Sequence, residues 1–126
     1  MVQLDQVHED IRGTMYRLLL PGNRELMVLF CKAGYYRGGH SHDQDEMVML
    51  LSGKMRYHKW INDVEQVTEL WEGNVTYNTA GCPHLAYFLE DSWVLDWKLD
   101  IGPHAAPGVT TDFEPFRQRV RERMTT

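Results

Sequence analysis

The chain has 126 residues, of which 43% are hydrophobic and 25% charged, and its formal net charge is −5. This length suits a single domain with a core of its own, and the composition is that of an ordinary soluble globular protein. The negative net charge argues against a nucleic-acid-binding surface. No apolar run reaches the roughly 18 residues of a membrane helix, which argues against a membrane span. Two cysteines are too few for a disulfide scaffold.

Turn signals divide the first hundred residues into short segments that are typical of β-strands. A Pro-Gly-Asn turn at residues 21–23 separates two of these segments and predicts a hairpin, and Gly53 separates a second pair in the same way. The expected strands cover residues 14–20, 25–31, 46–51, 54–61, 66–70, 75–78, 84–89 and 93–99. Many short strands at this spacing predict an all-β sandwich or barrel rather than an α/β fold.

The C-terminal part of the chain has a different character. Residues 102–108 contain two prolines and two glycines, which predicts a linking loop. Thr111 and Glu114 then have the spacing of a capping box, and apolar residues at positions 113, 116, 120 and 124 form one helical stripe. We therefore expect a barrel over residues 1–110 and a short C-terminal α-helix over residues 111–126. This helix packs on the barrel or on a dimer partner, with a lid over the barrel mouth as the alternative.

The segment of residues 34–46 carries the strongest chemical pattern. His40 and His42 are two residues apart, so both imidazoles point to the same face of an extended strand. Glu46 lies four residues further on, where a bend brings its carboxylate to the same centre. His84 follows a Gly-Cys-Pro turn and is the expected fourth donor, from a distant strand. Imidazole and carboxylate ligands suit Fe, Mn, Ni, Co or Zn, so the four residues predict a site for one divalent transition-metal ion.

The same residues resemble the two sequence motifs of the cupin superfamily. The first motif, G-x5-H-x-H-x3-E-x6-G, is matched at every fixed position: Gly34, His40, His42, Glu46 and Gly53. The second, G-x5-P-x-G-x2-H-x3-N, keeps its two glycines and its histidine, whereas Thr79 replaces its proline and Phe88 its asparagine. The resemblance implies a small single-domain metal-binding cupin. Its fold would be a double-stranded β-helix (jelly-roll barrel) of six to eight strands with the metal inside.

Three other side chains are candidates for catalysis or substrate binding. Arg37 precedes His40 by three residues and suits a carboxylate or phosphate, because its guanidinium pairs well with both; an exposed turn residue is the alternative. Tyr57 and Tyr77 are candidate acid–base groups if they point inward, and packing aromatics otherwise. Three histidines lack a partner at ligand spacing and are expected at the surface or in loops: His8, His58 and His104.

Four protein ligands leave one or two positions of a metal ion open for water, substrate or dioxygen. We therefore expect a metal-dependent cupin enzyme acting on a small polar metabolite that bears a carbonyl or carboxylate group. Isomerase, lyase or decarboxylase chemistry at a Lewis-acid metal stays open beside dioxygenase chemistry. The alternatives are a non-catalytic small-ligand-binding or sensor cupin and an enzyme like the cupin-type nucleotide-sugar ketoisomerases, which residues 37–42 resemble.

The expected partners are a small-molecule substrate and a second copy of the chain. Met47, Met49 and Leu51 alternate with the strand face that carries Glu46, and this spare apolar surface predicts a homodimer. No nucleic acid and no membrane is expected as a partner. The sequence opens without a charged-then-apolar leader, so the expected location is cytoplasmic, with both cysteines as free thiols.

Overall fold

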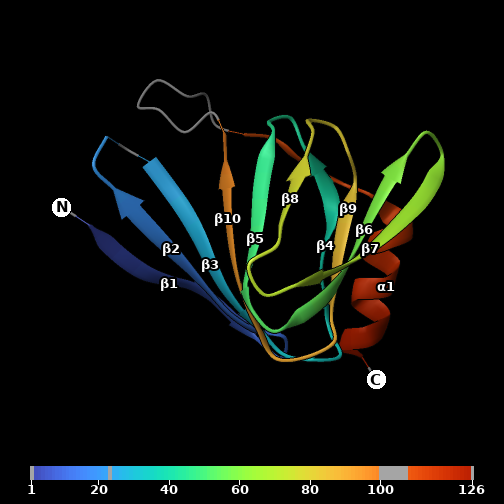
Figure 1. The fold of residues 1–126 in the computed structure, drawn as a ribbon, viewed down its shortest axis with the longest axis horizontal. Helices are drawn as coiled ribbons and strands as arrows, with labels where there is room; N and C mark the ends of the chain where they lie inside the picture. The colour runs from blue at the N-terminus through green and yellow to red at the C-terminus, as the bar shows by residue number, and fades with distance from the viewer. Residues whose placement is uncertain (1, 23, 100–107, 126) are drawn as a thin grey trace.

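A computed structural model of the chain describes residues 2–22, 24–99 and 108–125, and within them eleven strands form two antiparallel sheets (Figure 1). The six-stranded sheet has the order β1 (Gln3–Asp10), β2 (Gly13–Leu20), β3 (Arg24–Cys31), β10 (Ser92–Lys98), β5 (Glu46–Ser52) and β8 (Val75–Asn78). The five-stranded sheet has the order β11 (Thr110–Asp112), β4 (Tyr36–His42), β9 (His84–Phe88), β6 (Lys54–Ile61) and β7 (Val64–Trp71). The prediction of an all-β fold is thus confirmed.

The two sheets enclose one hydrophobic interior. Along β5, Glu46, Val48 and Leu50 are buried, whereas the residues between them are more exposed, as the two-residue period of a strand requires. The interior cluster draws on both sheets and consists of Leu29, Cys31, Val48, Leu50, Met55, Tyr57, Leu70, Ala86, Phe88 and Val94. A barrel of this kind places every inward side chain of β4, β5, β9 and β10 around one shared space.

The C-terminal helix, α1 (Glu114–Met124), lies against the outer face of the five-stranded sheet (Figure 1). Phe116 and Val120 are buried there together with Leu85 of β9. The approach is close at Gly39 of β4, where a Cβ atom would lie 3.0 Å from the backbone nitrogen of Arg117 and where φ is +82°. Only glycine tolerates both conditions, so it holds the helix close to the strand that carries two of the predicted metal ligands.

The start of the helix differs from the capping box predicted at Thr111. The helix begins at Glu114 with Phe113 as its N-cap, and no side chain caps it. Thr111 instead belongs to β11, where it pairs with Ser41 of β4. Thr111 lies two residues before the N-cap, too far to cap the first turn, so the predicted capping box was wrong. The expected loop of residues 102–108, with His104, lies outside the described residues except for Gly108.

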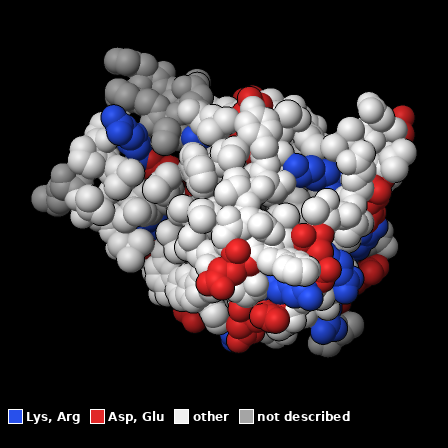
Figure 2. Space-filling model, in the orientation of Figure 1, with Lys and Arg blue, Asp and Glu red and all other residues white. Residues whose placement is uncertain are grey.

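On the face shown in Figure 2, acidic and basic side chains lie next to one another mainly in the lower part of the view, and no broad basic area is seen. The described part of the chain contains no helix long and apolar enough to cross a membrane. The absence of a nucleic-acid partner and the cytoplasmic location stay predictions. Both cysteines are free thiols, as expected.

Candidate metal centre

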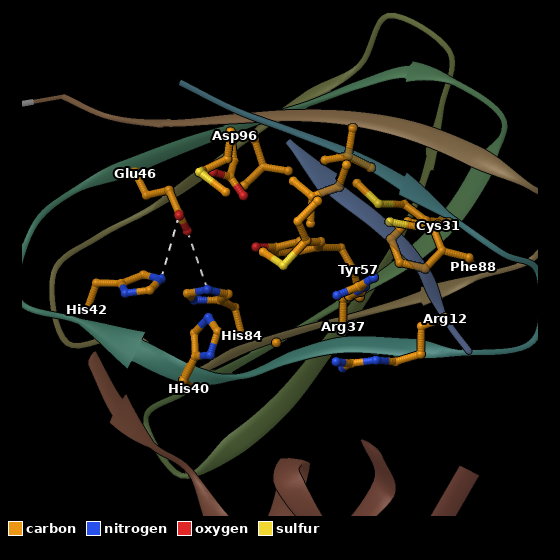
Figure 3. Close-up of a pocket in the computed structure, with 18 of the residues that line it drawn as sticks. Arg12, Cys31, Arg37, His40, His42, Glu46, Tyr57, His84, Phe88 and Asp96 are labelled. Atoms are coloured by element: carbon orange, nitrogen blue, oxygen red, sulfur yellow. Dashed lines mark ion pairs between the residues drawn. The ribbon is translucent and has the colours of Figure 1, made fainter. Parts of the chain in front are cut away.

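The four predicted ligands converge inside the barrel (Figure 3). His40 of β4 pairs directly with His84 of β9 across the sheet, and a bulge in β4 between Gly38 and His40 re-aims the strand just before the first ligand. The ligand atoms of His40, His42 and His84 all lie within 4.8 Å of one another. These three imidazoles come from one sheet and face Glu46, the first residue of β5 in the other.

Glu46 completes the group at close range. Its Oε1 lies 3.3 Å from Nε2 of His84, and its Oε2 lies 3.5 Å from Nε2 of His42. The carboxylate is itself held by two neighbours, since Lys98 Nζ donates to Oε2 at 2.6 Å and Asn78 Nδ2 donates to Oε1 at 3.0 Å. Such support fixes the position of the carboxylate.

Two of the histidines are oriented by hydrogen bonds from the ring nitrogen that faces away from the centre. Nδ1 of His84 lies 3.1 Å from the carbonyl oxygen of Cys82, which only accepts, so this nitrogen carries the proton. Nδ1 of His42 lies 3.1 Å from the hydroxyl of Thr110. Both arrangements direct Nε2 toward Glu46, and in His84 this nitrogen carries the lone pair that a metal ligand requires.

The protonation states also suit a cation. Burial lowers the pKa of His40, of His42 and of His84 to about 4 in each case, so all three are neutral at pH 7. Burial alone would raise the pKa of Glu46, but Lys98 and His84 and the two hydrogen bonds bring it below its ordinary value. Three neutral imidazoles and one carboxylate are the donor set that Fe, Mn, Ni, Co and Zn accept, so the residues present suit such an ion.

The metal ligands form one end of a cavity of about 340 Å³ between the sheets. Arg37 and Arg12 lie at the other end, beyond Tyr57 (Figure 3). The remaining walls are mainly apolar and include Met15, Met27, Leu29, Val48, Met55, Ala86, Phe88 and Val94. The cavity therefore has charged groups at two ends and an otherwise apolar lining.

The structure brings two of the three other candidates to this cavity. Arg37 is 8% exposed and lines it, so the alternative of an exposed turn residue is excluded. Tyr57 is buried, stacks on His84 with ring centres 6.1 Å apart, and accepts a hydrogen bond from Asn78 at 2.6 Å. Burial, followed by the charge of Glu46, raises the pKa of Tyr57 well above its ordinary value, which keeps its hydroxyl protonated.

Tyr77 does not reach the cavity. It is 41% exposed and donates to Asp45 at 2.5 Å on the outside of the barrel. Alternation along β8 explains this correction, because the neighbouring Asn78 takes the inward position. His58 was expected at the surface or in a loop, and this prediction was wrong. Its side chain is buried beneath α1 and forms a hydrogen bond of 2.8 Å with Glu65.

Sequence reasoning missed Asp96 and Lys98, which share the inward face of β10 and line the cavity. Burial raises the pKa of Asp96 to about 7, and the charge of Glu46 adds to this effect while Lys98 opposes it. A carboxyl group with a pKa near neutrality is suited to giving and taking a proton. The two-residue spacing of Asp96 and Lys98 was the available signal, but nothing in the sequence showed which face of the strand points inward.

Comparisons with known proteins place this geometry in a fold family. No protein-family model and no curated protein matches the chain. Among solved structures, the capsular polysaccharide assembling protein CapF from Staphylococcus aureus matches with a TM-score of 0.64 and 22% identity over 78% of the chain. Oxalate decarboxylase from Bacillus subtilis, a protein with Mn(II) centres, matches with a TM-score of 0.68 and 19% identity over 86% of the chain.

The chain spans 30% of the length of each of these two proteins, and at such identities the likeness concerns the fold. The chain therefore shares its double-sheet barrel fold with these two proteins, in keeping with the fold that its cupin-like motifs imply. Its His40-His42-His84 triad forms a candidate metal site inside that barrel.

Proposed function

We propose that the protein is a metal-dependent enzyme that acts on a small metabolite bearing a carbonyl or carboxylate group. One observation supports this most: a single small cavity combines a three-histidine, one-carboxylate ligand set with Asp96, whose pKa of about 7 suits proton transfer. A purely structural metal site has no need of an open cavity or of a titrating neighbour. The name of oxalate decarboxylase, which shares the fold, is in keeping with chemistry on a small acid.

We assign the following roles to the residues of the site. His40, His42, Glu46 and His84 would hold one divalent transition-metal ion, which when bound supplies a Lewis acid or, if it is iron, a centre for dioxygen chemistry. Lys98 and Asn78 hold the carboxylate of Glu46 in place. Asp96 gives or takes the proton that isomerisation, elimination or decarboxylation requires. This proton carrier favours those reactions over dioxygenation.

Replacement of Asp96 by asparagine tests this assignment. In protein loaded with Mn²⁺, Fe²⁺ or Zn²⁺, a panel of small oxo and carboxylic acids is followed for CO₂ release, for solvent-deuterium incorporation and for O₂ uptake. We expect turnover of at least one acid, and we expect Asp96→Asn to lower kcat about 100-fold or more with unchanged metal content, because general acid–base groups contribute this much. The pH–rate profile of the wild type should have a limb near pH 7, and Asp96→Asn should abolish this limb.

The matched control is Asp63→Asn, in an exposed turn where the backbone has a φ of 61° that asparagine tolerates. It should leave kcat unchanged. Full activity of Asp96→Asn would show that Asp96 is not the proton carrier. Binding of acids without turnover under any of the three metals would instead identify a ligand-binding cupin.

We also propose that the protein is a homodimer joined through the outer face of the six-stranded sheet. Leu51, Val75 and Trp93 are 38%, 44% and 39% exposed on strands β5, β8 and β10 of this face. Contiguous apolar surface of this kind marks interaction sites. Sedimentation equilibrium should give a dimer that Trp93→Ser converts to a monomer, whereas Trp71→Ser on β7 of the other sheet should not. A monomeric wild type contradicts the proposal.

A further inference from the structure

We propose that the cavity end opposite the metal ligands is a carboxylate-binding site formed by Arg37. Together with the proposed function, on which this inference rests for its metal end, it defines the substrate class: a short carboxylic acid with a second oxygen-bearing group at its far end. The carboxylate would pair with Arg37, and the second group would face the three histidines and Glu46.

One edge of the Arg37 guanidinium has no oxygen acceptor within hydrogen-bond distance. Its Nε and Nη2 atoms are both buried and lack such a partner among the described residues, and the Cys31 thiol, a weak acceptor, lies against the group. These two atoms form one side of the planar guanidinium, and their N–H bonds point in the same direction, which is the geometry that receives both oxygens of a carboxylate. A buried charged donor without an acceptor is costly, so the position calls for an acceptor that arrives with a ligand.

The nearest carboxylate in the structure is already fully used. Oδ1 of Asp10 accepts from the backbone nitrogen of Arg12 at 2.8 Å, and its Oδ2 accepts from Nη2 of Arg12 at 2.7 Å and lies 2.8 Å from Nε2 of His8. The distance from Oδ1 of Asp10 to Nη2 of Arg37 is 3.9 Å, too long for a hydrogen bond. Two guanidinium groups against one carboxylate leave this end of the cavity with one positive charge in excess.

No other anion among the described cavity-lining residues compensates Arg37. Burial raises the pKa of the nearby Cys31 thiol to about 12, so it is neutral. The remaining acidic side chains that line the cavity are Glu46, which is paired with Lys98, and Asp96, which lies toward the metal end (Figure 3). The missing negative charge therefore has to come from a ligand.

The form of the cavity limits that ligand. A volume of about 340 Å³ is at the lower end of the range for ligand pockets. Only a small molecule therefore fits between Arg37 and the metal ligands. The apolar side chains that line the rest of the cavity suit a hydrocarbon spacer. Phosphate pairs with a guanidinium edge as well as a carboxylate does, but this apolar lining favours the ligand that carries a hydrocarbon chain.

Calorimetric titration tests the site with and without metal. Butyrate, the dicarboxylates from malonate to adipate, and inorganic phosphate are titrated into chelator-treated protein and into Mn²⁺-loaded protein. We expect one dicarboxylate length to bind most tightly, and we expect Arg37→Met to weaken its binding at least tenfold in both forms. Arg37→Lys, which keeps the charge but loses the two-donor edge, should also weaken it several-fold. Mn²⁺ should strengthen the binding of that dicarboxylate but not of butyrate.

The control is Arg56→Met, because Arg56 is exposed on β6 and stacks over Tyr87 outside the cavity. Arg37→Met should also unfold at a temperature no lower than the ligand-free wild type, since it removes a buried cation whose nearest carboxylate is 3.9 Å away. Unchanged dicarboxylate affinity in both Arg37 variants would overturn the inference, as would phosphate binding more tightly than every dicarboxylate. An Arg37 effect in metal-free protein without any effect of Mn²⁺ would uphold the carboxylate site and contradict the proposed metal-dependent function.

Discussion

Replacement of His84 by alanine is expected to lower the affinity of the protein for Mn²⁺ by more than 100-fold. His84 is 5% exposed, its Nδ1 is fixed by the carbonyl of Cys82, and its Nε2 lies 3.3 Å from Glu46. Loss of a residue that merely orients a ligand costs about 10- to 100-fold in metal affinity, so loss of a direct donor costs more. His40 and His42 would remain as an incomplete pair on β4. Competition titration against a chelator of known affinity measures the change.

The control for this variant is His8→Ala. His8 lies on β1 with a side chain that is 50% exposed, and its contact is with Asp10 rather than with any of the four ligands. This substitution should leave the Mn²⁺ affinity within about twofold of the wild type. An affinity that His84→Ala leaves unchanged would show that the ion binds elsewhere, and the four-residue centre would then be wrong.

The metal-free protein should lose stability steeply as the pH falls from 6.5 to 4. The pKa of His40, His42 and His84 is lowered by burial to about 4 in the folded chain, against an ordinary value of 6.5. Above pH 6.5 these groups are neutral in both states and add no pH dependence. Between pH 6.5 and 4 the unfolded chain takes up protons that the folded chain does not, so the free energy of unfolding falls. One histidine contributes up to about 3 kcal/mol to this loss.

Urea unfolding of chelator-treated protein at pH 7, 6, 5 and 4 measures the effect. His42→Gln removes one of the three groups and should flatten the decline, whereas His8→Gln should not. A free energy of unfolding that stays constant from pH 7 to pH 4 would mean that the three imidazoles are not held together in a dry site. Addition of Mn²⁺ at pH 7 should raise the stability, because the ion binds only to the folded chain.

The spacing of the first cupin motif was enough to predict that His40, His42 and Glu46 lie together. His40, His42 and Glu46 are close in sequence, and their spacing indicates both the strand and the bend that follows it. All eight strands predicted from turns and alternation are present in the structure. The strand β1 was missed because its residues are mostly exposed and polar and show no alternation, as is common at the edge of a sheet.

The rest of the site depends on pairings between distant strands. Lys98 reaches Glu46 only because β10 pairs with β5 in a register that places these two residues opposite each other. Asn78 rather than Tyr77 takes the inward position on β8, a difference of one residue that so short a strand does not reveal by its sequence. His58 is buried because α1 covers it, although 56 residues separate it from the start of that helix. Such contacts appear only when the whole fold is known.

The most direct test of the metal centre is an anomalous difference map from crystals grown with Mn²⁺, with data collected on both sides of the Mn absorption edge. We expect one strong peak inside the barrel, within bonding distance of the imidazoles of His40, His42 and His84 and of the carboxylate of Glu46. The peak should disappear in crystals of His84→Ala. The absence of a peak at this position in wild-type crystals at saturating Mn²⁺, or a peak that persists in the variant, would contradict the four-residue metal centre.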